Sequence, residues 1–211
     1  MFNRVGKSSL DVNKSGGLYV SYGKEDAARY VKSLGPTTIG KLLGTSGEAV
    51  QHIKVKKSLK MPSDSETAKE TIKLLMKNKD LFDEFDKSLY SAAVTGELGK
   101  RIPEDYLESA LRNPLGKECQ KLSYGVSSFL GDPNYANESK VVYEHFRKLG
   151  YDVLPDTHDR LSGTSETAMI VINTDKVEVT STTMITKDVM KAGKQYVKSL
   201  EKLKVSDLIQ D

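Results

Sequence analysis

Short apolar and β-branched runs occur near both ends of this chain, and apolar residues at helical spacing fill its middle. In the first 62 residues the pattern predicts strands over 1–6, 18–22 and 49–55. A helix is expected over 25–34, because its apolar residues share one side and Gly35-Pro36 ends it. The N-terminal part therefore reads as strands with one short helix.

The middle of the chain reads as helices. Apolar stripes predict five of them, over 63–76, 81–90, 102–111, 118–130 and 138–149. Ser63 and Glu66 have the S/T-x-x-E spacing of a capping box, which marks the start of the first. A turn over 131–134 separates the last two helices.

The C-terminal part returns to strands, predicted over 150–155, 168–172 and 177–181, and closes with a helix over 187–204. The segment 168–172 is apolar at nearly every position, which implies burial on both faces. The segment 177–181 alternates, so one of its faces is expected to contact solvent.

Strands, then helices, then strands predict an α+β fold over a single domain, 1–211, with a mixed or antiparallel sheet. Neither end has enough strands to cover an apolar sheet alone, so strands from both ends are expected to share one sheet system. The helical part, about 63–149, is expected to be an insertion packed against that sheet. Its stripes are apolar and its charges fall on the opposite faces, so it is not expected to supply the key polar residues.

Composition narrows the class of protein. The net charge of +3, from 32 basic and 29 acidic residues, is too small to indicate nucleic-acid binding, although it does not exclude it. The single cysteine, Cys119, excludes an internal disulfide and a cysteine-based zinc cluster. No run approaches the roughly 18 apolar residues of a membrane span, and no secretory leader is present. These features favour a cytoplasmic protein that does not bind membranes.

The common catalytic and nucleotide-binding motifs are absent. The glycines between 35 and 47 fit neither a P-loop nor a dinucleotide-binding fingerprint, and a surface loop is expected there. His52 and His145 fall in a predicted strand and a predicted helix, and both are expected to be structural.

One polar loop has the composition of a metal site. Three aspartates and a histidine cluster there, namely Asp152, Asp156, His158 and Asp159. Such ligands hold divalent cations, which raises the hypothesis of a metal-dependent hydrolase. An Asx-rich turn explains the same residues, and it is favoured because no known cation-loop spacing is present. No metal is therefore expected.

The strongest chemical signal is a polar residue on each of three predicted strands. Glu166 immediately precedes the buried strand 168–172, where a rigid element would hold it against a ligand. Arg4 stands alone among apolar neighbours in the first strand, and Ser21 lies near the end of the second. Together they offer a cationic anchor, a positioning hydroxyl and a carboxylate.

These segments resemble ADP-ribosyltransferases of the Arg–Ser–Glu type, in the divergent form met in phage-associated and toxin-like proteins. The resemblance covers 2–6, 17–30, 150–152 and 165–173, and it does not include the middle of the chain. It implies a split β-sandwich, NAD as a substrate, and mono-ADP-ribosylation of a macromolecular target, most simply a protein. A phage-derived member would act in the cytoplasm of the host cell.

The resemblance also implies roles for individual residues. Glu166 would stabilise the cation that develops on the ribose, Ser21 would orient it, and Arg4 would grip the NAD. Tyr19 and Tyr22 would stack on a ring of NAD. Target recognition would fall to the loop that contains His158, Asp159, Arg160 and Thr164. Thr164 stands where arginine-directed members carry Glu or Gln, so arginine is not the expected target side chain.

A non-catalytic phage or mobile-element module that binds a protein partner is the alternative. The C-terminal predicted helix supports it through its lysines, Lys187, Lys191, Lys194, Lys198, Lys202 and Lys204. A solvated helix face accounts for the same pattern. NAD distinguishes the two hypotheses, because only the transferase would bind it and release nicotinamide.

Overall fold

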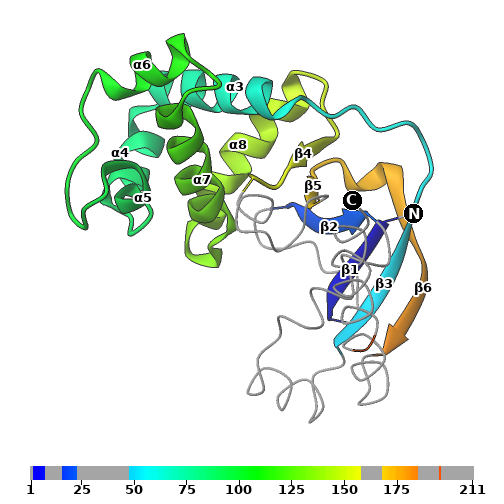
Figure 1. Cartoon of the computed structure of the whole chain (residues 1–211). Coiled ribbons are helices and arrows are strands. Elements are labelled where there is room, and N and C mark those ends of the chain that lie inside the picture. Colours follow the sequence, from blue (N-terminus) through cyan, green and yellow to red (C-terminus); the bar gives the residue numbers. More distant parts are fainter. Residues whose placement is uncertain (1, 8–15, 23–47, 158–167, 185–194, 196–211) are drawn as a thin grey trace, which may run out of the picture.

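In the computed structural model, which describes residues 2–7, 16–22, 48–157, 168–184 and 195, a six-stranded antiparallel sheet carries a helical layer on one side (Figure 1). The strand order is β4-β5-β2-β1-β3-β6. The strands are β1 (Phe2–Lys7), β2 (Leu18–Tyr22), β3 (Glu48–Val55), β4 (Val153–Pro155), β5 (Met169–Val171) and β6 (Val177–Met184). The three strands from the N-terminal part thus lie together in the middle of one sheet, with strands from the C-terminal part on both sides of them, which confirms the expected α+β class and shared sheet.

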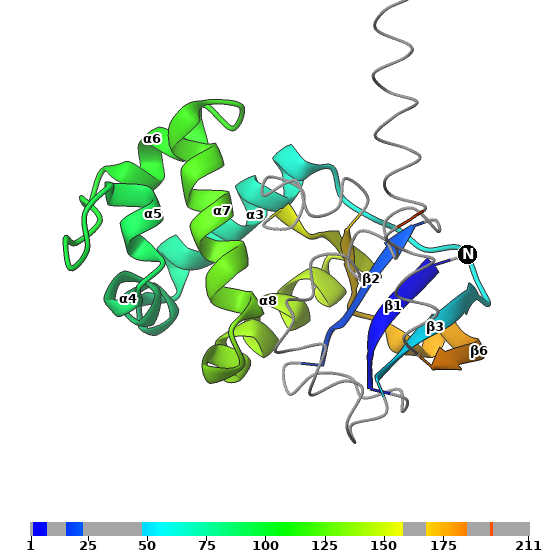
Figure 2. The same ribbon diagram turned by 60° about the horizontal axis from the view of Figure 1, so that its bottom comes forward.

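The sheet divides between β1 and β2. These strands pair at only two positions, Phe2 with Tyr22 and Asn3 with Ser21, whereas β1 pairs with β3 along its whole length from Phe2 to Lys7. Figure 2 shows β2, β1 and β3 as successive strands of a strongly twisted surface. The two halves, β4-β5-β2 and β1-β3-β6, are therefore joined by a short seam.

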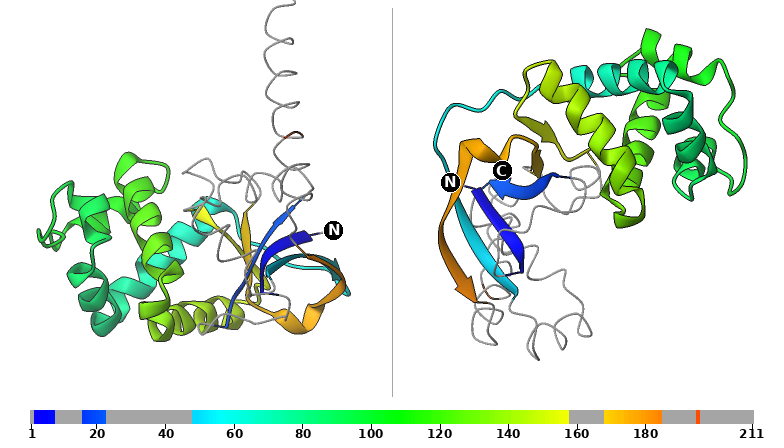
Figure 3. Two further views of the ribbon diagram at one scale, coloured as in Figure 1. Left: turned by 90° about the horizontal axis from the view of Figure 1, so that it is seen from below. Right: turned by 180° about the vertical axis from the view of Figure 1, so that it is seen from behind.

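Six α-helices form the described part of the helical layer. They are α3 (Asp64–Lys77), α4 (Lys79–Lys87), α5 (Ser91–Thr95), α6 (Tyr106–Arg112), α7 (Lys117–Gly131) and α8 (Ala136–Lys148), with short 3-10 turns η1 (Pro133–Tyr135) and η2 (Thr174–Lys176). In the two views of Figure 3 these helices gather at one side of the sheet, away from β6. The predicted helices over 25–34 and 187–204 lie outside the described residues, apart from position 195.

Two predicted helices differ from the structure. The second is broken after Lys87, because the Ser88 hydroxyl donates to the Phe85 carbonyl at 2.6 Å and α5 begins only at Ser91. The third begins at Tyr106 and not at residue 102, because the Ile102 N–H donates to the buried Asp86 carboxylate at 2.7 Å. In both places a side chain bonds to a backbone group at the point where the structure departs from the predicted helix. Strand boundaries also shift, since β4 begins at Val153 and β6 extends to Met184.

The capping box forms only in part. The Ser63 hydroxyl accepts the Glu66 N–H at 3.1 Å, as expected of an N-cap. The Glu66 carboxylate instead accepts the Tyr151 hydroxyl, from the segment that leads into β4. The start of α3 is thereby tied to the chain that re-enters the sheet.

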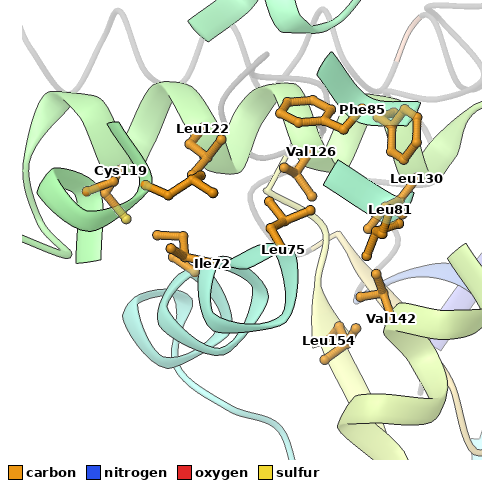
Figure 4. Close-up of a cluster of buried hydrophobic side chains, with 14 of the residues drawn as sticks. Ile72, Leu75, Leu81, Phe85, Cys119, Leu122, Val126, Leu130, Val142 and Leu154 are labelled. Atoms are coloured by element: carbon orange, nitrogen blue, oxygen red, sulfur yellow. The ribbon is translucent and has the colours of Figure 1, made fainter. Parts of the chain in front are cut away.

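Two apolar clusters lie on opposite faces of the sheet. The larger joins the helices to Leu154, Ile170 and Ile172 of the sheet layer, and Figure 4 shows its side chains from α3 and α7 facing one another. The smaller consists of Leu18, Val20, Ile53, Val153, Val171 and Val177. Neighbouring residues of β5 enter different clusters, so the predicted burial of 168–172 on both faces is confirmed.

At Gly17 the chain that enters β2 packs tightly against α8. A Cβ atom at this buried position would lie 2.8 Å from both Ile170 Cγ2 and Tyr143 Cε2. We expect Gly17→Ala to lower the free energy of unfolding by about 1–3 kcal/mol, the usual effect of overpacking. Gly131→Ala is the control, because its Cβ would meet nothing closer than 3.7 Å. Urea unfolding of both variants is the measurement, and equal stability of the two would contradict the expectation.

Candidate functional site

Three segments that are distant in sequence meet at one end of the central strands. β2 lies between β1 and β5, and its register pairs Ser21 with Asn3 on one side and Val20 with Met169 on the other. The next position along β5 toward its start is Ala168, which the register sets beside Ser21. The backbone therefore brings the start of β1, the end of β2 and the start of β5 together.

Glu166 precedes this junction by two residues. The two ends of the β4–β5 connection are hydrogen-bonded to each other, because the Asp156 N–H donates to the Ala168 carbonyl at 3.0 Å. Glu166 itself lies outside the described residues. The expected recognition residues His158, Asp159, Arg160 and Thr164 lie outside them too, so the roles of all five remain predictions.

Arg4 occupies the first position of β1 beyond its pairing with β2. It pairs with Gln51 of β3, while its neighbour Asn3 pairs with Ser21. Because successive positions of a strand alternate between faces, a regular pleat would set Arg4 and Ser21 on opposite faces. The seam ends at this point, so Arg4 stands where the sheet divides. The side chains of Arg4, Ser21 and Tyr22 are not among those that the structure describes.

Tyr19 is the one expected NAD contact whose side chain is described. It is half-buried against the helical cluster, and its hydroxyl lies 3.2 Å from that of Tyr143 on α8. Tyr143 is fully buried. The contact between sheet and helices accounts for Tyr19 without any ligand, so the structure gives its aromatic ring a packing role.

Asp152 of the suspected metal loop has protein partners. Its carboxylate accepts hydrogen bonds from Lys176 Nζ at 2.8 Å, the Lys60 N–H at 3.0 Å and Asn173 Nδ2 at 3.1 Å. Burial raises the pKa of Asp152, but these donors and the Lys176 charge outweigh it, and the net pKa lies below its ordinary value. Among the described residues no cluster of metal-ligating side chains is present. The Asp152 carboxylate is therefore occupied by protein donors and is not expected to bind a metal. His158 and Asp159 lie outside the described part of the chain.

His145 and His52 both lie within regular secondary structure. His145 lies on α8, stacks edge-on against Phe146 and has its Nε2 atom 3.7 Å from Glu70 Oε2. The pKa of Glu70 is lowered, chiefly by a hydrogen bond from Lys73. His52 lies in β3 opposite Asn3, as the strand prediction expected.

Sequence reasoning missed the residue that joins α8 to two strands. Arg147 Nε donates to the Ile172 carbonyl at 2.8 Å, and its Nη2 donates to the Gly16 carbonyl at 3.3 Å, just before β2. A polar cleft of about 480 Å³ adjoins it, lined also by Asn173 and Lys176. No local pattern identifies Arg147, because both partners are backbone groups far away in sequence.

Comparison with protein-family models, curated proteins and solved structures gave no match. Within the described parts of the chain, no helix has the length and apolar character that crossing a membrane requires.

Proposed function

We propose that this chain is an NAD-dependent mono-ADP-ribosyltransferase that modifies a protein in the cytoplasm. The observation that carries the proposal is the junction of β1, β2 and β5. The register brings together the segments of Arg4 and Ser21 and the strand that Glu166 precedes. Residues at the ends of rigid strands are held in the fixed positions that catalysis requires.

The fold gives secondary support. The antiparallel sheet divides at a short seam, as a split sandwich would, and its strands come from both ends of the chain. The helices 64–148 stand apart as an insertion between β3 and β4. The likeness to the transferase sandwich is part of the proposal.

The proposed chemistry uses each residue type for a physical reason. The bond between ribose C1′ and the nicotinamide nitrogen breaks, nicotinamide leaves with the bonding electron pair, and positive charge develops on the ribose. The Glu166 carboxylate stabilises that charge. A nucleophilic side chain of the target protein attacks C1′ and gives up its proton to water. Arg4 holds the pyrophosphate by charge-assisted hydrogen bonds, and Ser21 orients the reacting end.

Arg4→Ala is expected to weaken NAD binding by roughly tenfold to a hundredfold, the effect of losing a hydrogen bond to a charged group. Isothermal titration of NAD into the parent and the variant measures it. Asn3→Ala is the matched comparison, because Asn3 is the register partner of Ser21. If only Asn3→Ala lowered the affinity for NAD, the NAD would bind on the face of the sheet opposite Arg4. The proposed role of Arg4 would then be wrong.

Measurements on the parent protein distinguish the transferase from the partner-binding module. Saturable NAD binding with release of nicotinamide supports the transferase. A folded parent that neither binds NAD nor releases nicotinamide would refute it and leave the partner-binding module.

A further inference from the structure

The polar cleft beside Arg147 lies between the end of α8 and the turn that follows β5 (Figure 1). Its volume of about 480 Å³ is in the range of small-molecule sites. Backbone hydrogen bonds hold its walls together. The Ile172 N–H donates to the Asp152 carbonyl at 2.9 Å, and the Tyr151 N–H donates to the Phe146 carbonyl at 3.1 Å. The side chains of the lining are therefore carried by a fixed backbone.

Arg147 brings to this cleft a cation that no carboxylate neutralises. Its Nε donates to the Ile172 carbonyl and its Nη2 to the Gly16 carbonyl, and both acceptors are uncharged. Among the described residues, its Nη1 has no hydrogen-bond partner and its guanidinium forms no ion pair. A guanidinium has five N–H donors, so donors remain for a ligand. Because the two carbonyls already hold the side chain, little of its conformational entropy is left to lose on binding.

The other cation of the lining, Lys176, is already neutralised. Its Nζ lies 2.8 Å from Oδ2 of the buried Asp152. Asp175 is exposed on the same turn and forms no ion pair within the described part of the chain. The lining thus holds one unpaired positive charge and one unpaired negative charge. A ligand group with a single negative charge suits Arg147, whereas Asp175 would repel a phosphate dianion more strongly.

Tyr151 adds one charge of each sign at the edge of the cleft. Lys60 Nζ lies 4.9 Å from the centroid of its ring, and its hydroxyl donates to the Glu66 carboxylate. These two charges offset each other. Arg147 and Asp175 therefore determine which ligand charge the cleft favours.

We propose that this cleft binds a small organic acid through its carboxylate. The carboxylate accepts hydrogen bonds from the remaining Nη donors of Arg147, whose planar fork matches its geometry. Thr174 and Asn173 line the same cleft and can bond to polar substituents of the acid. Leu18 pairs with Val171, so the cleft lies at the end of β2 and β5 opposite the junction proposed for NAD. The proposal is independent of the transferase function.

Lactate and lactamide are suitable probes, because a neutral amide in one replaces the carboxylate of the other. In NMR titrations of the full chain, we expect lactate to cause saturable shifts of the Asn173 and Thr174 backbone amides. Lactamide is expected to cause none. Methyl phosphate, added at the same ionic strength, is expected to bind more weakly than lactate.

Arg147→Gln is expected to lower the affinity for lactate about tenfold or more, the effect of losing hydrogen bonds between charged groups. Arg112→Gln, at an exposed position of α6, is the matched control and is expected to bind like the parent. Asp175→Asn removes a like charge from the lining without touching the bonds of Arg147. It is expected to raise the affinity for lactate about twofold to fivefold.

Four results would each overturn the site. They are no saturable lactate shift in the parent, equal binding of lactamide, unchanged lactate affinity in a folded Arg147→Gln variant, and no gain in affinity in Asp175→Asn. The last of these does not depend on whether Arg147→Gln folds. Tighter binding of methyl phosphate than of lactate would contradict a carboxylate ligand.

Discussion

Replacement of Glu166 by Gln is expected to lower the rate of nicotinamide release from NAD by ~100-fold or more. The substitution keeps the size of the side chain and removes the charge that would face the developing ribose cation. Stability is expected to change little, because a carboxylate at the start of a strand contributes little to packing. The loss should therefore appear in turnover and leave NAD affinity close to that of the parent.

The measurement is nicotinamide release under saturating NAD, beside a melting curve for each protein. Glu178→Gln is the matched control, because Glu178 is exposed on β6, at the far edge of the sheet from the junction. Release at the parental rate in Glu166→Gln would exclude the transferase mechanism. A folded Glu178→Gln variant with the same loss would show that the effect is not specific to Glu166.

Within the described residues, the positions of the strands and helices were largely predictable from the sequence. Leu18–Tyr22 is a strand over the range that its β-branched and aromatic residues predict. The first long helix runs from Asp64 to Lys77 behind the predicted Ser63 cap. These elements were predictable because their signals are local: side-chain periodicity, cap residues and glycine or proline stops.

The late start of α6 was not predictable, because a residue distant in sequence holds the chain before it. Asp86 accepts the Ile102 N–H and is paired with Arg101 Nε at 2.8 Å, so the chain before α6 is held against α4. The apolar spacing of 102–111 reads as helix throughout and contains no sign of this contact. Tertiary bonds of this kind override local propensity.

The candidate site was predictable in part. The sequence identified Arg4, Ser21 and Glu166 as residues of separate strands, but not the strand order that makes β2 the neighbour of both β1 and β5. The resemblance assigns Tyr19 to NAD, and nothing in the sequence indicates that its hydroxyl lies 3.2 Å from that of Tyr143, 124 residues away. Register and long-range pairing are properties of the assembled sheet, and a single strand does not encode its neighbours.

Asp152 is the polar centre that joins three parts of the chain. Its backbone N–H donates to the Lys60 carbonyl at 2.8 Å, and its own carbonyl accepts the Ile172 N–H at 2.9 Å. Its side chain, with 4% of the residue exposed, binds Lys176, Asn173 and the Lys60 N–H. The segment before α3, the start of β4 and the turn after β5 are thus held by one residue.

Asp152→Asn is accordingly expected to lower the free energy of unfolding by about 3 kcal/mol, because it leaves buried donors without an acceptor. One carboxylate oxygen becomes an NH₂ group, which would face N–H donors from either Lys60 and Lys176 or Asn173. For a chain of this size the melting temperature should fall by roughly 6–12 °C. Asp175→Asn, at an exposed position of the neighbouring turn, should change it by less than about 1 °C. Equal effects of the two substitutions would contradict a special role for Asp152.

The pH dependence separates the charge of Asp152 from its shape. Because the pKa of Asp152 is lowered on folding, its carboxylate stabilises the folded protein fully above the unfolded pKa of about 3.9. That stabilisation is lost as the pH falls through the folded pKa, which lies lower still. The stability gap between the parent and Asp152→Asn should therefore be constant from pH 7 to about pH 5, and narrow below about pH 4. Urea unfolding of both proteins across this range measures the gap. A gap that stays constant down to pH 3 would show that steric fit, and not the paired charge, explains the effect of the substitution.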